Sequence, residues 1–159
     1  MSEVKRQNKG KRSLEVGQLG EQVVADWLEA REWQILHHRW YCPWGEIDLV
    51  ARSPDAALIF VEVKTRSSGN WDLNGLLAIT PQKQAKLWQT AEAFLAQYPN
   101  YADFLCRFDL ALVHYKRVLD SAVGSSPVIL NQPVWRSGYE FALENYLEGV
   151  AMTGSGTSA

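Results

Sequence analysis

Residues 58–66 read Leu58-Ile59-Phe60-Val61-Glu62-Val63-Lys64-Thr65-Arg66, an apolar run that gains a charge at every other position in its second half. β-Branched and aromatic residues favour a strand, and successive side chains of a strand point to opposite faces. The face that carries the charges therefore holds Phe60, Glu62, Lys64 and Arg66. A carboxylate inside an apolar stretch is costly unless it is solvated, paired or bound to an ion. The pattern predicts a strand with one apolar face and one charged face.

A second apolar run that contains a carboxylate precedes this strand. It reads Gly45-Glu46-Ile47-Asp48-Leu49-Val50, is strand-like from Glu46 to Arg52, and is followed by the turn residues Ser53-Pro54-Asp55. Residues 34–41 form a further strand-like segment, which the turn chemistry of residues 42–45 joins to this one. We therefore expect a three-stranded antiparallel meander that brings Asp48 beside Glu62, because neighbouring strands lie about 4.8 Å apart.

Two helices are expected around this meander. Ser13 is a suitable cap for a helix from Leu14 to about Arg31, whose apolar residues recur at helical spacing. Within it, Glu21 lies at the margin of the apolar face, and Gly17 and Gly20 each cost about 1 kcal/mol relative to Ala. These glycines suggest that backbone or a ligand approaches closely there.

The second half of the chain continues the alternation of helix and strand. Thr80-Pro81 is a strong helix start, Pro99 ends the helix, and its polar face carries Gln82, Lys83 and Lys86. We expect strands at Arg107–Tyr115 and Val128–Leu130, a turn region between them, and a helical stretch around Tyr139–Leu147. The order of helix, three strands, helix and strand predicts an α/β fold.

Length and composition indicate one compact unit. The chain has 159 residues, 47% of them hydrophobic, which suits a single domain. We divide it into a flexible basic arm at residues 1–12, one domain at 13–149 and a disordered tail at 150–159. The arm either follows a phosphate backbone or is a solvated tail. The net charge of -2 argues against a protein that coats nucleic acid by bulk electrostatics.

The sequence lacks the marks of export. No apolar run is long enough to span a bilayer, and the basic first residues do not resemble a secretory signal, so we expect a cytoplasmic protein without membrane contact. Cys42 and Cys106 are far apart and outside any CxxC pair, which favours buried thiols over a disulfide or a zinc site.

The charged strand face is typical of a metal site. Mg²⁺ and Mn²⁺ prefer one or two carboxylates, with water and substrate phosphate completing the shell, which Asp48 and Glu62 would allow. Lys64 is placed to contact a phosphate or an attacking water. We interpret it as a charged stabiliser because nearby carboxylates favour its charged form. The alternative is a solvated salt bridge of Glu62 with Lys64 on an exposed face.

These runs resemble the YraN family of predicted endonucleases, of the PD-(D/E)XK nuclease superfamily. Further matches are Gly17-x-x-Gly20-Glu21-x-x-Val24-Ala25, Lys83 and Arg107-Phe108-Asp109, and the resemblance covers about residues 14–115. It implies an α/β fold with a restriction-endonuclease-like αβββαβ core, in which helices flank a mixed central sheet. The resemblance also implies kinship with the archaeal Holliday junction resolvases.

Carried over residue by residue, the resemblance makes Asp48 and Glu62 the metal-binding acids and Lys64 the catalytic lysine. Glu21 matches the extra acid that resolvase-like members place on the first helix, and Val63 would contribute its backbone carbonyl to the metal. The chain departs from the family pattern at His38-Arg39, where an Arg-Asn pair is common, and in its Trp-rich loops. These departures lie outside the catalytic residues. They bear on which substrate shape is accepted, because the loops would border a bound strand.

We therefore expect a Mg²⁺- or Mn²⁺-dependent, structure-selective endonuclease that acts on branched or single-stranded DNA, with a homodimer as one alternative for its assembly. The basic candidates for DNA contact are Arg66, Lys83, Lys86, Lys11 and Arg12. The competing interpretation is a nucleic-acid-binding or assembly protein that keeps the scaffold without turnover. The acidic pI of about 5.9 favours this second interpretation.

Other polar and aromatic residues near the expected site have two interpretations. Trp40, Trp44 and Trp71 either stack on unpaired bases or fill the core. Glu46 is an outer-shell ligand or faces water, and Asp109 supports the metal shell or pairs with Arg107. The three histidines, His37, His38 and His114, lack metal-ligand spacing and are expected to be structural.

Overall fold

The computed structural model describes residues 2–67, 80–119 and 126–150. Within these ranges the chain forms a mixed α/β fold of two helices and one six-stranded sheet, whose strands lie in the order β1-β2-β3-β4-β6-β5. Among the described strands, β3 and β4 run parallel and the other neighbouring pairs are antiparallel. The elements are α1 (Ser2–Ala30), β1 (Gln34–Cys42), β2 (Gly45–Arg52), β3 (Ala57–Arg66), α3 (Pro81–Gln97), β4 (Leu105–Arg117), β5 (Pro133–Arg136) and β6 (Tyr139–Glu148), with a 3-10 turn at Pro99–Tyr101.

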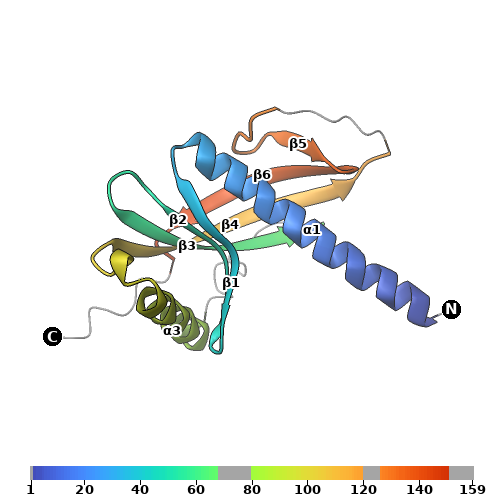
Figure 1. The fold of residues 1–159 in the computed structure, drawn as a ribbon. Helices are drawn as coiled ribbons and strands as arrows, with labels where there is room; N and C mark the ends of the chain where they lie inside the picture. Colours follow the sequence, from blue (N-terminus) through green and yellow to red (C-terminus); the bar gives the residue numbers. More distant parts are fainter. Residues whose placement is uncertain (1, 68–79, 120–125, 151–159) are drawn as a thin grey trace.

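The two helices cover opposite faces of the sheet (Figure 1). Val24 of α1 belongs to one core cluster with Ile59 and Val61 of β3. Phe94 of α3 belongs to the other cluster with Phe60. The alternation predicted for β3 is confirmed, because neighbouring residues of the strand enter different cores. Both faces are apolar along most of the strand, and only its last residues carry the charges.

The predicted meander and the second helix are confirmed. β1, β2 and β3 pair in antiparallel fashion, with β1 against β2 and β2 against β3. The side chain of Thr80 caps α3 by accepting a hydrogen bond of 3.2 Å from the Lys83 N–H, and Pro81 occupies the first turn. The capping threonine and the proline that follows it are local signals, which is why the sequence predicts the start of this helix well.

The start predicted for the first helix is wrong. α1 begins at Ser2, so residues 2–12, expected as a flexible arm, are helical and Ser13 is an interior residue. Lys, Arg, Glu and Gln are good helix formers and no proline interrupts them, so the helix continues through Ser13. At 1.5 Å per residue its 29 residues span about 44 Å, and the N-terminal part extends beyond the sheet (Figure 1).

Two predictions for the C-terminal region are also wrong. Tyr139–Glu148 is strand β6, and Val128–Leu130 forms neither strand nor helix. β6 pairs with β4 along its length, and the alternating residues Phe141 and Leu143 are fully buried against the α1 core. Tertiary burial of a period-two pattern has outweighed the helix propensity of the Glu, Ala and Leu residues. The predictions for Trp71, for most of the turn after residue 119 and for the tail beyond residue 150 lie outside the described residues.

None of the helices in the described ranges has the length and hydropathy needed to cross a membrane.

The sheet opens between β2 and β3, and this opening positions the charged residues. β2 pairs with β3 only from Leu49–Val61 to Arg52–Leu58. Beyond Leu49, β2 stays with β1 as far as Gly45, whereas β3 stays with β4 as far as Arg66. Asp48 and Glu62 are therefore the first residues past the last β2–β3 pair, on either side of the opening.

Candidate functional site

Asp48 lies where the β2–β3 ladder ends. Its Oδ2 accepts a hydrogen bond of 2.8 Å from the backbone N–H of Val63. This side chain thus satisfies a backbone donor of β3 at a position where β2 no longer pairs with β3. The N–H and C=O of one strand residue point to the same edge, so the Val63 carbonyl is also directed towards the opening. A carboxylate and a backbone carbonyl thus share this side of the site.

The environment of Asp48 disfavours its charge. Burial raises the Asp48 pKa from 3.8 to about 7, the nearby charges of Glu21, Glu62 and Glu46 add to the rise, and the Val63 hydrogen bond opposes it. At neutral pH the side chain is therefore close to half protonated. A bound cation would stabilise the ionised form.

Glu62 is held in the opposite state by two lysines. Its Oε1 lies 2.9 Å from Lys64 Nζ and 3.3 Å from Lys83 Nζ. Burial alone would raise the Glu62 pKa, but the hydrogen bond and charge of Lys64 and the charge of Lys83 lower it below its ordinary value. The second oxygen, Oε2, is buried and has no hydrogen-bond partner among the described residues. An ionised carboxylate with one unsatisfied oxygen is costly, and a ligand at Oε2 would offset that cost.

Lys64 is a cation in this setting. Burial lowers its pKa, but the hydrogen bond and charge of Glu62 and the charge of Asp48 raise it above the ordinary 10.5. Lys64 therefore carries its proton throughout the physiological pH range.

Glu21 reaches the site from α1 but is engaged elsewhere. Arg39 donates to both of its oxygens, from Nε at 2.9 Å and from Nη2 at 3.2 Å, in a bidentate pair. Arg39 itself adopts a left-handed backbone conformation with φ 50°. In the described part of the chain, no three His, Cys, Asp or Glu side chains form a group that could hold a metal ion. The contribution of Glu21 visible in the geometry is its charge, which raises the Asp48 pKa.

Sequence reasoning did not identify Arg39 as the partner of Glu21. A carboxylate at the margin of an apolar helix face needs a cation nearby, which was the one available signal. The two residues are 18 positions apart in the sequence, a separation for which no spacing rule would select Arg39.

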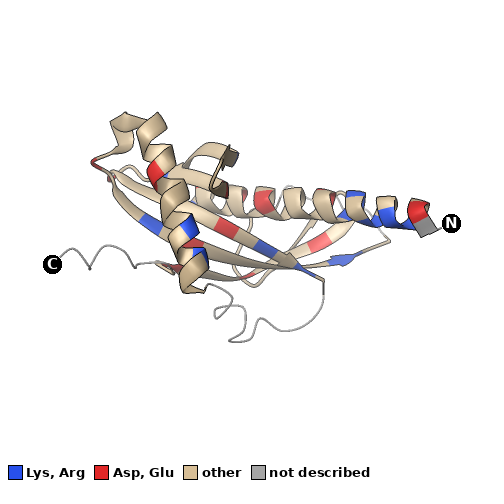
Figure 2. Ribbon diagram, turned by 90° about the horizontal axis from the view of Figure 1, so that it is seen from below, with Lys and Arg blue, Asp and Glu red and all other residues tan. Residues whose placement is uncertain are grey.

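The predicted basic residues divide into two groups. Lys83 and Lys86 of α3 line a pocket that also contains Asp48 and Glu62. Figure 2 shows the basic positions of α3 near acidic positions of the strands behind it. Lys11 and Arg12 are exposed on the N-terminal half of α1, and Arg66 is exposed at the end of β3.

The pocket lies between α3 and the hairpin of β1 and β2 and has a volume of about 180 Å³. The hairpin approaches α3 closely there, because a Cβ added at Gly45 would lie 3.3 Å from Thr90 Oγ1. Its lining residues are Trp44, Gly45, Glu46, Ile47, Asp48, Phe60, Val61, Glu62, Lys83, Lys86, Leu87, Thr90 and Phe108.

The aromatic residues near the site divide into packed and exposed side chains. Trp40 is buried, with its ring centroid 5.2 Å from that of Phe94, so base stacking by Trp40 is wrong. His37 packs against the same phenylalanine at 5.4 Å. Trp44, by contrast, is 56% exposed at the hairpin tip, and Glu46 is exposed beside it. Cys42 and Cys106 are free thiols but only half-buried.

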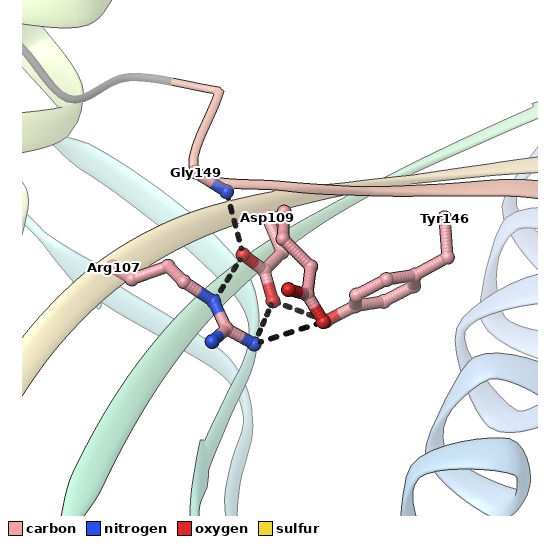
Figure 3. A network of polar contacts seen from close by, with 5 residues as sticks. Arg107, Asp109, Tyr146 and Gly149 are labelled. Atoms are coloured by element: carbon pink, nitrogen blue, oxygen red, sulfur yellow. Dashed lines mark hydrogen bonds and ion pairs between the residues drawn. The ribbon is translucent and has the colours of Figure 1, made fainter.

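Asp109 belongs to a separate buried network (Figure 3). Arg107 donates to its two oxygens at 2.8 and 3.1 Å, Tyr146 Oη donates to Oδ2 at 2.6 Å, and the Gly149 N–H donates to Oδ1 at 3.1 Å. Burial and the carboxylate raise the Tyr146 pKa, so the phenol stays protonated. Of the two alternatives for Asp109, the structure displays the pair with Arg107. The network ties β4 to the end of β6.

Comparison with known proteins places the site in a family context. The model described as "Uncharacterised protein family UPF0102" matches residues 20–113, a range that contains Asp48, Glu62, Lys64 and Lys83. A UPF0102 protein of Acaryochloris marina is 45% identical over 160 residues, covering 90% of this chain and 93% of its own length. A UPF0102 protein of Synechocystis sp. is 46% identical over 143 residues, covering 84% and 95%. A third, from Thermosynechococcus vestitus, is 53% identical over 102 residues, covering 64% and 82%.

Proposed function

We propose that this chain, which belongs to the uncharacterised protein family UPF0102, is a divalent-metal-dependent endonuclease that hydrolyses phosphodiester bonds in DNA. The observation that carries the proposal is the buried Oε2 of Glu62, which has no hydrogen-bond partner among the residues that the structure describes. It lies across the sheet opening from Asp48, a second carboxylate, whose pKa is raised by burial. In a solvated salt bridge the second carboxylate oxygen is exposed to water, whereas a buried oxygen without a protein partner is available to bind a cation.

The order of elements supports a restriction-endonuclease-like core for the same chain. Within the described residues, α1, β1, β2, β3, α3 and β4 follow one another in the order α, three β, α, β, with Asp48 on the second strand and Glu62 and Lys64 on the third. The same arrangement supports the proposed relationship to PD-(D/E)XK nucleases such as the Holliday junction resolvases. A fold relationship alone does not establish an activity, so the proposal depends on the site.

The donor set fits a hard divalent cation. Asp48, Glu62 Oε2 and the Val63 carbonyl offer oxygen only, as Mg²⁺ and Mn²⁺ prefer, and Mg²⁺ is usually bound through one or two carboxylates. When bound, such an ion would supply a lowered pKa for a water molecule and polarise the phosphate. Glu21 would act through its charge on Asp48 rather than as a direct ligand.

The chain's own residues would hold and orient the substrate. Lys64, a permanent cation next to Glu62, would stabilise negative charge that develops on the phosphate. Lys83 shares Glu62 Oε1 at 3.3 Å and would contact the phosphate backbone from α3. Asp48 has a pKa of about 7 and would lose its proton on metal binding.

A cleavage assay tests the proposal. The full chain is incubated with junction, flap and single-stranded DNA in Mg²⁺ or Mn²⁺, alongside Glu62→Gln and Lys64→Met. We expect cleavage by the wild-type protein and a loss of about 100-fold or more in each variant. The ion pair of Lys116 and Glu140, 3.0 Å apart on β4 and β6, with Lys116 exposed and Glu140 half-buried, provides the matched controls Lys116→Met and Glu140→Gln, which should cleave normally. Absence of cleavage, or equal activity in all variants, would overturn the proposal.

One observation favours a second candidate, a nucleic-acid-binding or assembly protein that retains the scaffold without turnover. Glu62 Oε1 is already shared by two lysines, so much of its charge is balanced without a metal ion. This candidate predicts DNA binding that weakens with salt and is indifferent to Mg²⁺. A Mg²⁺-dependent gain in DNA affinity that disappears in Asp48→Asn would exclude it.

A further inference from the structure

The pocket between α3 and the β1–β2 hairpin has a strongly apolar floor. Ile47, Phe60 and Phe108 line it and are themselves almost fully buried. Its volume is about 180 Å³, and an apolar cavity of about 150 Å³ is known to accept one benzene ring. The pocket therefore has room for one planar ring system and none for a stacked base pair.

One end of the pocket is polar and adjoins the proposed site. Asp48 and Glu62 line the same pocket. A ring bound in the pocket would therefore lie next to any chemical group that is bound at the two carboxylates. Lys83 and Lys86 lie one turn apart on α3 along the rim. Lys83 pairs with Glu62, whereas Lys86 forms no ion pair within the described ranges. A ring that carries a phosphate matches this combination of an apolar floor and a basic rim.

The mouth of the pocket presents an aromatic surface. Trp44 is 56% exposed although it is a large apolar side chain, and it lines the pocket at the hairpin tip. Gly45, beside it, approaches Thr90 closely, so this tip lies against α3. An exposed tryptophan beside basic residues is a typical stacking platform for the bases of single-stranded nucleic acid.

We propose that this pocket receives one unpaired nucleotide of a DNA strand, with its base against Trp44 and its phosphate between Lys83 and Lys86. The inference rests on the proposed nuclease function and specifies its substrate: single-stranded DNA, or duplex that is locally opened. A base held in a duplex cannot enter, because its pairing partner and stacked neighbours occupy the space that the pocket walls need.

DNA binding without divalent metal tests the pocket separately from catalysis. The probe is a fluorescein-labelled 12-nucleotide oligothymidine, compared with a 12-base-pair duplex, in EDTA with the full chain, and affinity is followed by fluorescence anisotropy. We expect tighter binding of the single strand. Trp44→Ala should weaken it about five- to 150-fold, the range that aromatic stacking on one base gives, and Trp44→Phe should restore most of the loss.

The hairpin supplies a matched control. Tyr41 is also an exposed aromatic residue, at 61%, but it does not line the pocket, so Tyr41→Ala should bind like the wild-type protein. Lys86→Met should weaken binding and reduce the slope of log affinity against log salt by about 0.7, as expected for one lost phosphate contact on a single strand.

The outcomes separate the two proposals. Equal binding of single strand and duplex, or equal losses in Trp44→Ala and Tyr41→Ala, would overturn the pocket assignment even if the protein cleaves DNA in Mg²⁺. Trp44-dependent binding of the single strand would support the pocket even if no substrate is cleaved, in which case the nuclease proposal alone would fail.

Discussion

Asp48 and Glu62 show how two carboxylates on neighbouring strands acquire opposite properties. Asp48 accepts one backbone hydrogen bond and lies among three other acids, so its pKa rises to about 7. Glu62 contacts two lysines, so its pKa falls. Paired titratable groups with pKa values pushed in opposite directions are a frequent property of catalytic sites.

The raised Asp48 pKa predicts that Asp48→Asn stabilises the fold at alkaline pH. Between pH 4 and 7 the native state holds a proton on Asp48 that the unfolded state has lost, so this residue lowers the free energy of unfolding as the pH rises. Above pH 7 the cost is complete, on the order of 2 to 4 kcal/mol. Asn removes the charge and still accepts from Val63, so its advantage should be full at pH 8 and absent at pH 4.

Urea unfolding of the wild-type protein and Asp48→Asn at pH 8, 6 and 4 measures this difference. Glu140→Gln is the control, because Glu140 pairs with Lys116 away from the opening. An Asn variant that is less stable than the wild-type protein at pH 8 would show that the Asp48 carboxylate is favourably solvated or paired.

The sequence predicts the placement of a single side chain where the two-residue period of a strand alone decides which face that side chain occupies. Alternation along residues 58–66 placed Glu62 and Lys64 on one face, and the meander brought Asp48 beside them. The Glu21–Arg39 pair was not predictable in this way, since it joins α1 to β1 through a left-handed residue.

At the scale of elements, α1 meets β3 at a glycine. A Cβ added at Gly20 would overlap Thr65 Oγ1 and lie 3.3 Å from the Thr65 Cβ and Cγ2 atoms, whereas one at Gly17 would meet only the end of Arg39, at 3.8 Å. The sequence predicted a close approach at both positions, and the structure has it at Gly20. This contact fixes how the helix that carries Glu21 lies on the strand that carries Glu62.

Gly20→Ala and Gly17→Ala should therefore change stability in opposite directions. Gly20→Ala forces Thr65 or the helix to move and should destabilise the protein by about 1 to 3 kcal/mol. Gly17→Ala would make only an ordinary contact with the end of Arg39, at 3.8 Å, and should stabilise the protein by up to about 1 kcal/mol through helix propensity. Both are measured by urea unfolding at one pH, and equal effects of the two substitutions would contradict the packing described for α1.

Elements were predicted well where local chemistry specifies them and poorly where tertiary contacts do. The Thr80-Pro81 start of α3 is a local signal. Tyr139–Leu147 contains good helix formers and therefore favours a helix by local propensity. Its pairing with β4 and the burial of its side chains in the core beneath α1 select the extended form of β6 instead. The start of α1 was misjudged because a capping residue at Ser13 does not stop a helix that has good formers before it.

At the scale of the whole molecule, the central feature is the opening of the sheet between β2 and β3. No residue pattern shows where pairing of two strands will stop, so the sequence predicted adjacent carboxylates but not the opening beside them. The acidic net charge of -2 also conceals local basic surfaces on α3 and on the projecting half of α1.

The projecting half of α1 should be dispensable for folding. Residues 3–15 are all exposed, so deleting residues 2–12 should change the free energy of unfolding by no more than about 0.5 kcal/mol and leave Ser13 as the new helix cap. The deletion removes Lys5, Arg6, Lys9, Lys11 and Arg12, and should weaken DNA binding more at low salt than at high salt. Anisotropy titrations at two salt concentrations measure this, and salt-independent affinity loss would contradict an electrostatic role.

Calorimetric titration of Mg²⁺ and Mn²⁺ into the full chain measures whether a metal ion binds between Asp48 and Glu62. The titration is made at pH 8, because Asp48, with its pKa of about 7, is then largely ionised. We predict metal binding that weakens at least tenfold in both Asp48→Asn and Glu62→Gln and stays unchanged in Glu140→Gln. No binding by the wild-type protein, or equal binding by all variants, would contradict a metal site at the opening between β2 and β3.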